Sequence, residues 1–126
     1  MNRIVLDTGA LIALERNDRS MWAALKLAAS TYSDVLVPST ALAQVWRGAP
    51  TQALLSRALS FCAIAPFDPL ARQVGELCGR ARTSDICDAH VALVSSMRGD
   101  VLYTGDPADL KRLLVACGRI TAIVRC

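Results

Sequence analysis

The residues of this chain best suited to chemistry are five aspartates in short motifs. They are Asp7, Asp85, Asp88, Asp106 and Asp109. Clustered carboxylates repel one another, so a site that they share needs a cation or shared protons. Carboxylate oxygens favour Mg²⁺, for which Mn²⁺ can substitute, and the chain lacks a His/Cys ligand set with the spacing of a zinc site. If the five aspartates converge, the sequence predicts a magnesium site.

Two of these aspartates are expected at the same edge of a sheet. Asp7 directly follows the short apolar run Ile4–Leu6, which is typical of a buried strand. Asp106 follows a second such run, 101–103, after two intervening residues. Because ligands of open α/β sheets bind at the carboxyl ends of the strands, we expect both carboxylates to face one crevice.

The other aspartates are expected near the first turns of helices. Asp85 and Asp88 are three residues apart and can face the same side of one helix. Each aspartate also has a structural interpretation. Asp85, Asp88, Asp106 and Asp109 suit a helix N-terminus, and Asp7 suits a turn. These interpretations stay open for each residue alone, and the joint occurrence favours a shared site.

Apolar runs and helical spacings alternate along the chain. The expected strands are Ile4–Leu6, Val35–Val37, Ala63–Ala65, Val101–Tyr103 and Ile120–Val124. The first expected helices are 10–14, a helix capped by Asp18 or Ser20, and a helix from Ser39 (as N-cap) to Trp46. Two more are expected over Gln52–Ser60 and Pro69–Arg80. The last two run from a Thr83-Ser84 cap to Met97, with Gly99 as the stop, and from Asp106 (as N-cap) to Gly118. This alternation predicts one α/β domain over residues 1–126, a three-layer α/β/α sandwich around a mainly parallel five-stranded sheet.

The composition is that of a globular protein with an excess of basic residues. The chain is 53% hydrophobic and 20% charged, with a net charge of +3. Setting the five aspartates aside leaves six acidic residues against fourteen Lys and Arg. A basic protein with a single acidic site suits a polyanionic partner. No signal peptide is visible, and no apolar run approaches the roughly 18 residues of a membrane span.

The cysteines indicate a reducing compartment. They are Cys62, Cys78, Cys87, Cys117 and Cys126, an odd number without a CxxC motif. We interpret them as reduced thiols of a cytoplasmic protein that mostly fill the core.

Four motifs together resemble one protein family. They are Asp7-Thr8 after an apolar strand, Val37–Gly48, Asp85–Ala92 and Leu102–Leu110, in this order over nearly the whole chain. The set is similar to PIN domains, and among these to the VapC toxins of bacterial toxin–antitoxin pairs. The resemblance implies a PIN-like fold and a cytoplasmic, metal-dependent endoribonuclease. It further implies a homodimer and an antitoxin partner that blocks the acidic cleft.

The resemblance also assigns roles to individual residues. Asp7, Asp88 and Asp106 match the acids that hold Mg²⁺ and carry catalysis, and Asp109 resembles an additional late acid of many members. Hydrolysis by a metal-bound water would leave a 5′-phosphate and a 3′-hydroxyl. The number of metal ions, one or two, stays open.

One position departs from the family pattern. Gln44 stands where the family usually carries a glutamate. An amide oxygen can bind a metal or a metal-bound water but adds no charge. We expect Asp85, one helical turn from Asp88, to compensate. The hydroxyls of Thr8 and Thr104 are candidates for aiming the carboxylates, although both also suit turns and strand ends.

Basic and aromatic side chains could bind RNA or a protein partner. The arginines expected at the rim of the cleft are Arg16, Arg47, Arg80 and Arg82, each of which could equally be a solvated surface residue. Trp22 and Trp46 either belong to the core or pack against a dimer mate or an antitoxin segment. His90, the single histidine, is expected to be structural.

Two alternatives belong to other classes of function. A PIN-like module that has lost catalysis would bind RNA or antitoxin without cleaving, with Gln44 marking the impaired site. A phosphatase of the haloacid dehalogenase type needs a second Asp after the first strand, where this chain has Asp7-Thr8-Gly9. A phospho-receiver needs an acidic pair there and a late lysine, and both are missing from those positions.

Overall fold

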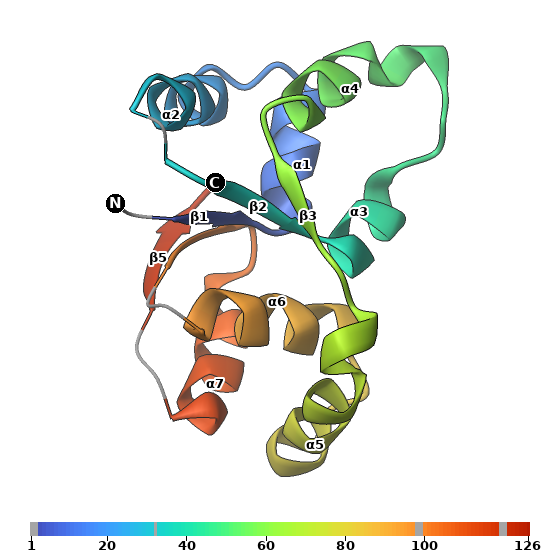
Figure 1. Cartoon of the computed structure of the whole chain (residues 1–126), viewed down its shortest axis with the longest axis vertical. Helices are drawn as coiled ribbons and strands as arrows, with labels where there is room; N and C mark the ends of the chain where they lie inside the picture. The colour runs from blue at the N-terminus through green and yellow to red at the C-terminus, as the bar shows by residue number, and fades with distance from the viewer. Residues whose placement is uncertain (1–2, 32, 98–99, 119–120) are drawn as a thin grey trace.

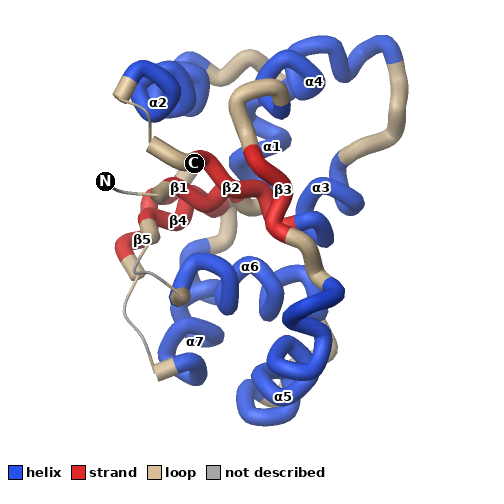
Figure 2. Tube along the Cα trace, in the orientation of Figure 1, coloured by secondary structure: helices blue, strands red, loops and turns tan. Residues whose placement is uncertain are grey.

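A computed structural model describes residues 3–31, 33–97, 100–118 and 121–126. In these residues the strands are β1 (Ile4–Leu6), β2 (Val35–Pro38), β3 (Ala63–Ala65), β4 (Val101–Thr104) and β5 (Ala122–Arg125). They form one sheet in the order β3-β2-β1-β4-β5, and every neighbouring pair is parallel. Figure 2 shows these strands as a single layer between helices. The expected five-stranded α/β sheet is confirmed.

The helices of the described residues cover both faces of this sheet. They are α1 (Thr8–Glu15), α2 (Arg19–Ser30), α3 (Ser39–Val45), α4 (Ala53–Leu59), α5 (Ala71–Ala81), α6 (Ile86–Ser96) and α7 (Pro107–Cys117), with short 3₁₀ turns η1 (Pro50–Gln52) and η2 (Asp68–Leu70). In Figure 1, α1, α2 and α4 lie on one side of the sheet and α5, α6 and α7 on the other. Within the described ranges, no helix combines the length and the apolar character needed to cross a bilayer.

The order of the strands creates a switch point between β1 and β4. From β1 the chain builds outward through β2 to β3, and it then returns to place β4 on the opposite side of β1. Connections that leave two adjacent strands in opposite directions open a crevice at the carboxyl ends, where α/β sheets bind ligands. Asp7 follows β1 and Asp106 follows β4, so the topology brings both residues to this crevice.

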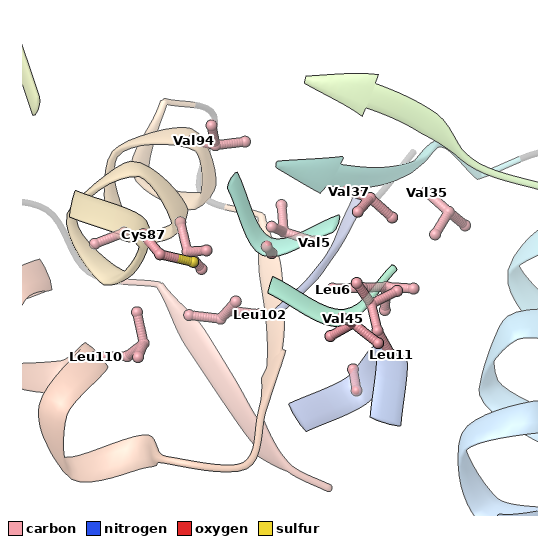
Figure 3. Close-up of a cluster of buried hydrophobic side chains, with 14 of the residues drawn as sticks. Val5, Leu6, Leu11, Val35, Val37, Val45, Cys87, Val94, Leu102 and Leu110 are labelled. Atoms are coloured by element: carbon pink, nitrogen blue, oxygen red, sulfur yellow. The ribbon is translucent and has the colours of Figure 1, made fainter. Parts of the chain in front are cut away.

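The central strand anchors the hydrophobic core. Val5 and Leu6 point to opposite faces, as neighbours in a strand do, and both are fully buried. Figure 3 shows Leu11 of α1 and Leu110 of α7 in the same buried cluster, together with Val37 of β2. Because β1 is covered on both faces, its end at Asp7 is held in a fixed position.

Two expected helix caps are wrong. Ser39 is the first residue of α3 rather than its cap, and its hydroxyl accepts a hydrogen bond from the Phe67 N–H at 3.0 Å. This bond ties the start of α3 to the segment after β3, a long-range contact that local sequence cannot indicate. The cap of α6 is Asp85, since its Oδ1 accepts from the Asp88 N–H at 3.0 Å. The Thr83 hydroxyl does not cap the helix itself; it accepts a hydrogen bond from the N–H of the cap residue Asp85.

Other local expectations differ by a residue or two. The Asp18 cap of α2 is confirmed, with its carboxylate accepting from the Met21 N–H at 2.9 Å. Three helices begin one or two residues from their expected starts, at Thr8 instead of Ala10, Ala53 instead of Gln52, and Ala71 instead of Pro69. The expected stop at Gly99 and the expected strand start at Ile120 lie outside the described residues.

The cysteines are free thiols, but not all of them fill the core. Cys78 and Cys87 are buried, and Cys62 and Cys117 are partly buried. Cys126 is exposed beyond β5, so the core interpretation is wrong for this residue.

A glycine substitution tests how closely the start of α1 approaches the turn after β4 at the switch point. A Cβ on Gly9 would lie 2.5 Å from the Gly105 nitrogen and 2.8 Å from its Cα, which are backbone atoms that cannot turn aside. We expect Gly9→Ala to lower the free energy of unfolding by roughly 1–3 kcal/mol in urea denaturation. Gly75→Ala is the matched control. Gly75 lies within α5 with no atom within 4 Å of an added Cβ, so alanine should stabilise by up to about 1 kcal/mol. Equal effects of the two variants would contradict the close approach.

Candidate active site

Asp7 is the buried centre of the crevice. Its side chain is 4% exposed, and both carboxylate oxygens accept hydrogen bonds. Oδ1 accepts from the Thr8 N–H at 2.6 Å, and Oδ2 accepts from the Thr104 hydroxyl at 2.8 Å. Burial raises the pKa of Asp7 above its ordinary value, while these hydrogen bonds act in the opposite direction. The fold thus fixes the direction of a carboxylate that burial alone would disfavour.

Thr104 connects Asp7 to the second strand end. Its buried hydroxyl donates to Asp7 and also accepts from the Asp106 N–H at 3.0 Å. Asp106 occupies the cap position of α7, but its carboxylate does not cap the helix. Instead it lies beside Asp109, whose pKa is raised by hydrogen bonding with Asp106 and by the Asp106 charge. The expected role of Thr104 in aiming a carboxylate therefore has a structural basis.

Asp88 lies in the field of the other acids. Burial, followed by the charges of Asp85 and Asp7, raises the pKa of Asp88 to about 7, and Asp109 contributes further. Asp85 acts on Asp88 from the cap position of α6, where one of its oxygens is already used. The helix-start interpretation thus holds for Asp85, which limits its capacity to compensate for a missing ligand.

The acids share an electrostatic field without forming a tight cluster. Among the described residues, no group of three or more His, Cys, Asp or Glu side chains lies close enough together to hold a metal ion. The mutual effects on pKa nevertheless link Asp88 to Asp85, Asp7 and Asp109. Repelling carboxylates that face one crevice are the arrangement that a cation would relieve.

Gln44 joins this site through Thr8. The Thr8 hydroxyl donates to the Gln44 Oε1 at 2.8 Å, while the Thr8 N–H holds Asp7. The amide therefore faces the crevice at its exposed rim. Hydrogen bonds of a single residue, Thr8, thus connect Gln44 to Asp7, but Gln44 brings no negative charge.

Sequence reasoning missed Cys87 as a neighbour of the site. Its Sγ lies 3.9 Å from the Thr8 hydroxyl, and burial raises the pKa of the thiol to about 11. The position of Cys87 directly before Asp88 was the signal in the sequence that places it near the site. His90 is fully buried with Nδ1 2.7 Å from the Thr40 hydroxyl, and burial lowers its pKa. These contacts agree with a structural histidine.

The four expected arginines lie at the ends of elements, in different settings. Arg16 ends α1 and Arg82 ends α5 in a left-handed conformation, with φ of 54°. Arg47 folds back to donate to two carbonyl groups at the end of α3. Arg80 lines a groove of about 390 Å³ together with residues of α5, α6 and α7.

A fifth arginine near the acids was missed. The Arg112 guanidinium donates to the Ala81 carbonyl at 3.0 Å and partly offsets the raised pKa of Asp109. Its place one turn after Asp109 on α7 was the signal in the sequence.

The two tryptophans separate into the two expected classes. Trp22 is buried, and its Nε1 donates to the Leu14 carbonyl at 3.0 Å. Trp46 is 41% exposed just after α3, so the core interpretation is wrong for it.

The Thr104 hydroxyl can be tested by removing it. Thr104→Val leaves Asp7 Oδ2 and the Asp106 N–H without their partner, and an unsatisfied buried polar group costs about 1–3 kcal/mol. We expect that loss in the free energy of unfolding, measured in urea. Thr104→Ser keeps the hydroxyl and should restore most of it. A valine variant as stable as the serine variant would show that the bridge does not matter.

The raised pKa of Asp88 predicts the pH dependence of stability without metal. Between an ordinary aspartate pKa near 4 and about 7, the unfolded chain has lost a proton that the folded protein keeps. Stability should therefore fall as pH rises through this window and level off above it. Asp88→Asn should flatten the slope, in urea denaturation with chelator at pH 5 and pH 8. Asp68→Asn removes an exposed carboxylate outside the site and should leave the wild-type slope.

Comparison with known proteins agrees with this arrangement at the level of the fold. The sequence matches no protein-family model and no curated protein. A chain in the structure of VapBC2 from Rickettsia felis, bound to a DNA fragment from its promoter, is 18% identical with a TM-score of 0.72, over 98% of each chain. A chain of DNA-bound VapBC from Salmonella typhimurium is 19% identical with a TM-score of 0.67, over 99% of this chain and 98% of that chain.

A third similar structure is FitAB bound to an IR36 DNA fragment, with 18% identity and a TM-score of 0.64, over 97% of this chain and 94% of that chain. At such identities, the likeness shows a common architecture. The five-stranded parallel sheet with its flanking helices is therefore the PIN-like α/β fold that the sequence motifs implied.

Proposed function

We propose that this protein is a metal-dependent endoribonuclease that acts as the toxin of a toxin–antitoxin pair. The observation that carries the proposal is the fixed carboxylate of Asp7 at the switch point. It is buried and directed by Thr8 and Thr104, and Asp106 follows two residues after Thr104, the last residue of the neighbouring strand β4. A buried, aimed carboxylate among other acids is an arrangement suited to a cation and a phosphodiester rather than to a structural turn.

The chemistry of the donor set, rather than its spacing in the structure, suits a hard divalent cation. Asp7, Asp88 and Asp106 would hold Mg²⁺, with Asp109 as a further oxygen donor, and Mn²⁺ could replace it. Burial and then the charges of Asp85 and Asp7 raise the pKa of Asp88, and a bound cation would offset the repulsion among these carboxylates. When bound, the ion would supply Lewis-acid activation of water and charge stabilisation for phosphodiester hydrolysis.

The residues of the chain would orient this chemistry. Thr8 and Thr104 fix the direction of the Asp7 oxygens, and Thr104 also sets the turn that carries Asp106. Gln44 would contribute an uncharged oxygen or an amide donor at the rim. The side chain of His90 is buried against Thr40, so it takes no part as a general base.

The similar structures support a protein partner for this chain. VapBC2, VapBC and FitAB are complexes, and we propose that this chain likewise binds a cognate antitoxin protein. We also propose that it forms a homodimer and acts in the cytoplasm on RNA. The excess of Lys and Arg outside the acidic site supports a polyanionic substrate. Arg16, Arg80, Arg82 and Arg47 are the proposed contacts to the RNA backbone.

Cleavage of RNA by the purified chain is the direct test. We expect total cellular RNA to be cut into discrete fragments with Mg²⁺ or Mn²⁺ and to stay intact with chelator. Asp7→Asn and Asp88→Asn should each slow cleavage by on the order of 100-fold. Asp68→Asn, which removes an exposed carboxylate outside the site, should cleave at the wild-type rate. Cleavage that persists in chelator would contradict the proposal.

Gln44 favours a second candidate function, a PIN-like module that binds RNA or antitoxin without cleaving. The site has an amide where another carboxylate would add charge, and Asp85 already caps α6. Under this alternative, neither the wild type nor the aspartate variants cleave RNA, while RNA or antitoxin still binds. Gln44→Glu should then restore metal-dependent cleavage if the missing charge is the cause.

A further inference from the structure

Gln44 is an exposed amide that the fold connects directly to the centre of the candidate active site. It lies near the end of α3, which packs against α1, and its Oε1 accepts a hydrogen bond from the Thr8 hydroxyl at 2.8 Å. The backbone N–H of the same Thr8 donates to Asp7 Oδ1 at 2.6 Å. Both bonds come from one residue at the start of α1, so the amide lies on the wall of the crevice next to Asp7.

The contacts of Thr8 use the oxygen end of this amide. Burial raises the pKa of Cys87 to about 11, so the thiol keeps its proton at neutral pH. Its Sγ lies 3.9 Å from the Thr8 Oγ1, at a distance where a thiol can donate a weak hydrogen bond. A hydroxyl that accepts from a thiol still has its own proton to donate, and Gln44 Oε1 takes it. Donation thus runs outward from Cys87 through Thr8 to the amide oxygen.

The nitrogen end of the same amide is left free. Nε2 carries two N–H donors, and Gln44 Nε2 makes no hydrogen bond to any other residue that the structure describes. Gln52, the next glutamine along the chain, uses its Nε2 on the Val45 carbonyl and on Glu15. One glutamine therefore connects structural elements, whereas the other presents unused donors beside the acids.

Free N–H donors suit an anionic oxygen and not a cation. Hard metal ions are bound by oxygen ligands, which an amide nitrogen does not provide. Phosphate oxygens in nucleic-acid complexes, by contrast, commonly accept hydrogen bonds from glutamine and asparagine side chains. A neutral amide at this position also avoids the repulsion that a carboxylate would exert on a phosphate.

We propose that Gln44 binds the substrate, with its amide N–H groups donating to a non-bridging oxygen of the phosphodiester in the crevice. The inference rests on the proposed function for the nature of the substrate. It assigns Gln44 to the substrate rather than to the metal ion, which leaves the aspartates as the side chains that hold the ion. Because phosphates are common to all sequences, this contact adds affinity without selecting a base.

RNA binding in the absence of metal tests the contact. In chelator, Gln44→Met keeps the length of the side chain but loses the donors, and it should bind a labelled oligonucleotide roughly tenfold more weakly than the wild type. Gln44→Glu should bind more weakly still, because its carboxylate repels the phosphate. The loss should be the same for oligouridylate and oligoadenylate, measured by fluorescence anisotropy. Gln73→Met, which changes an exposed glutamine of α5, is the matched control and should bind as the wild type does.

Manganese binding distinguishes a substrate contact from a metal ligand. Without RNA, Gln44→Met should bind Mn²⁺ as tightly as the wild type in a titration followed by electron paramagnetic resonance. The reason is that Asp7 is held by the backbone N–H of Thr8, which this substitution leaves in place. Losing a group that supports a metal site typically costs about 10- to 100-fold in metal affinity, so the two roles give different results.

The outcomes separate this inference from the proposed function. A weakened Gln44→Met in a protein that never cleaves RNA would support the phosphate contact and reject the nuclease. Equal RNA binding by Gln44→Met and the wild type would overturn the contact even if the wild type cleaves. A loss of Mn²⁺ affinity, a loss confined to one of the two oligonucleotides, or a wild type that binds neither of them would also overturn it. Because Gln44 is exposed, the variants should fold, which the urea midpoint would check.

Discussion

The hydrogen bond from the Thr104 hydroxyl to Asp7 is the interaction on which the candidate site depends. It joins the ends of β1 and β4, which are 97 residues apart in the chain. The bond forms because the two strands are neighbours at the switch point and because Gly9 and Gly105 let the start of α1 lie against the turn after β4. A buried carboxylate would be costly without it, so the same contact that stabilises the sheet also aims the acid.

Around this fixed carboxylate, the remaining acids are arranged more loosely. Asp88 has a pKa of about 7 because burial and the charges of its neighbours disfavour ionisation. Asp106 lies beside Asp109 at the start of α7, and the Asp85 carboxylate caps α6. The fold thus combines one rigid acid with several that repel each other. This combination lowers stability at neutral pH, because carboxylates in one another's field resist ionisation.

The turn that follows α3 is also ordered. Gln52 fixes the turn after α3 with its buried amide, and Arg47 uses its guanidinium on the carbonyl groups at the end of that helix. Trp46 is therefore presented by a rigid support rather than by a free loop.

The sequence by itself determined the fold class and the identity of the acids, because short apolar runs, helical spacings and aspartates after strands are local signals. It could not determine the strand order that places β4 beside β1, since that order depends on which runs pack together. Contacts of Ser39 with Phe67 and of Gln52 with Glu15 were hidden for the same reason. Whether a polar side chain caps its own helix or reaches a distant segment is decided only when the layers pack and each buried polar group must find a partner.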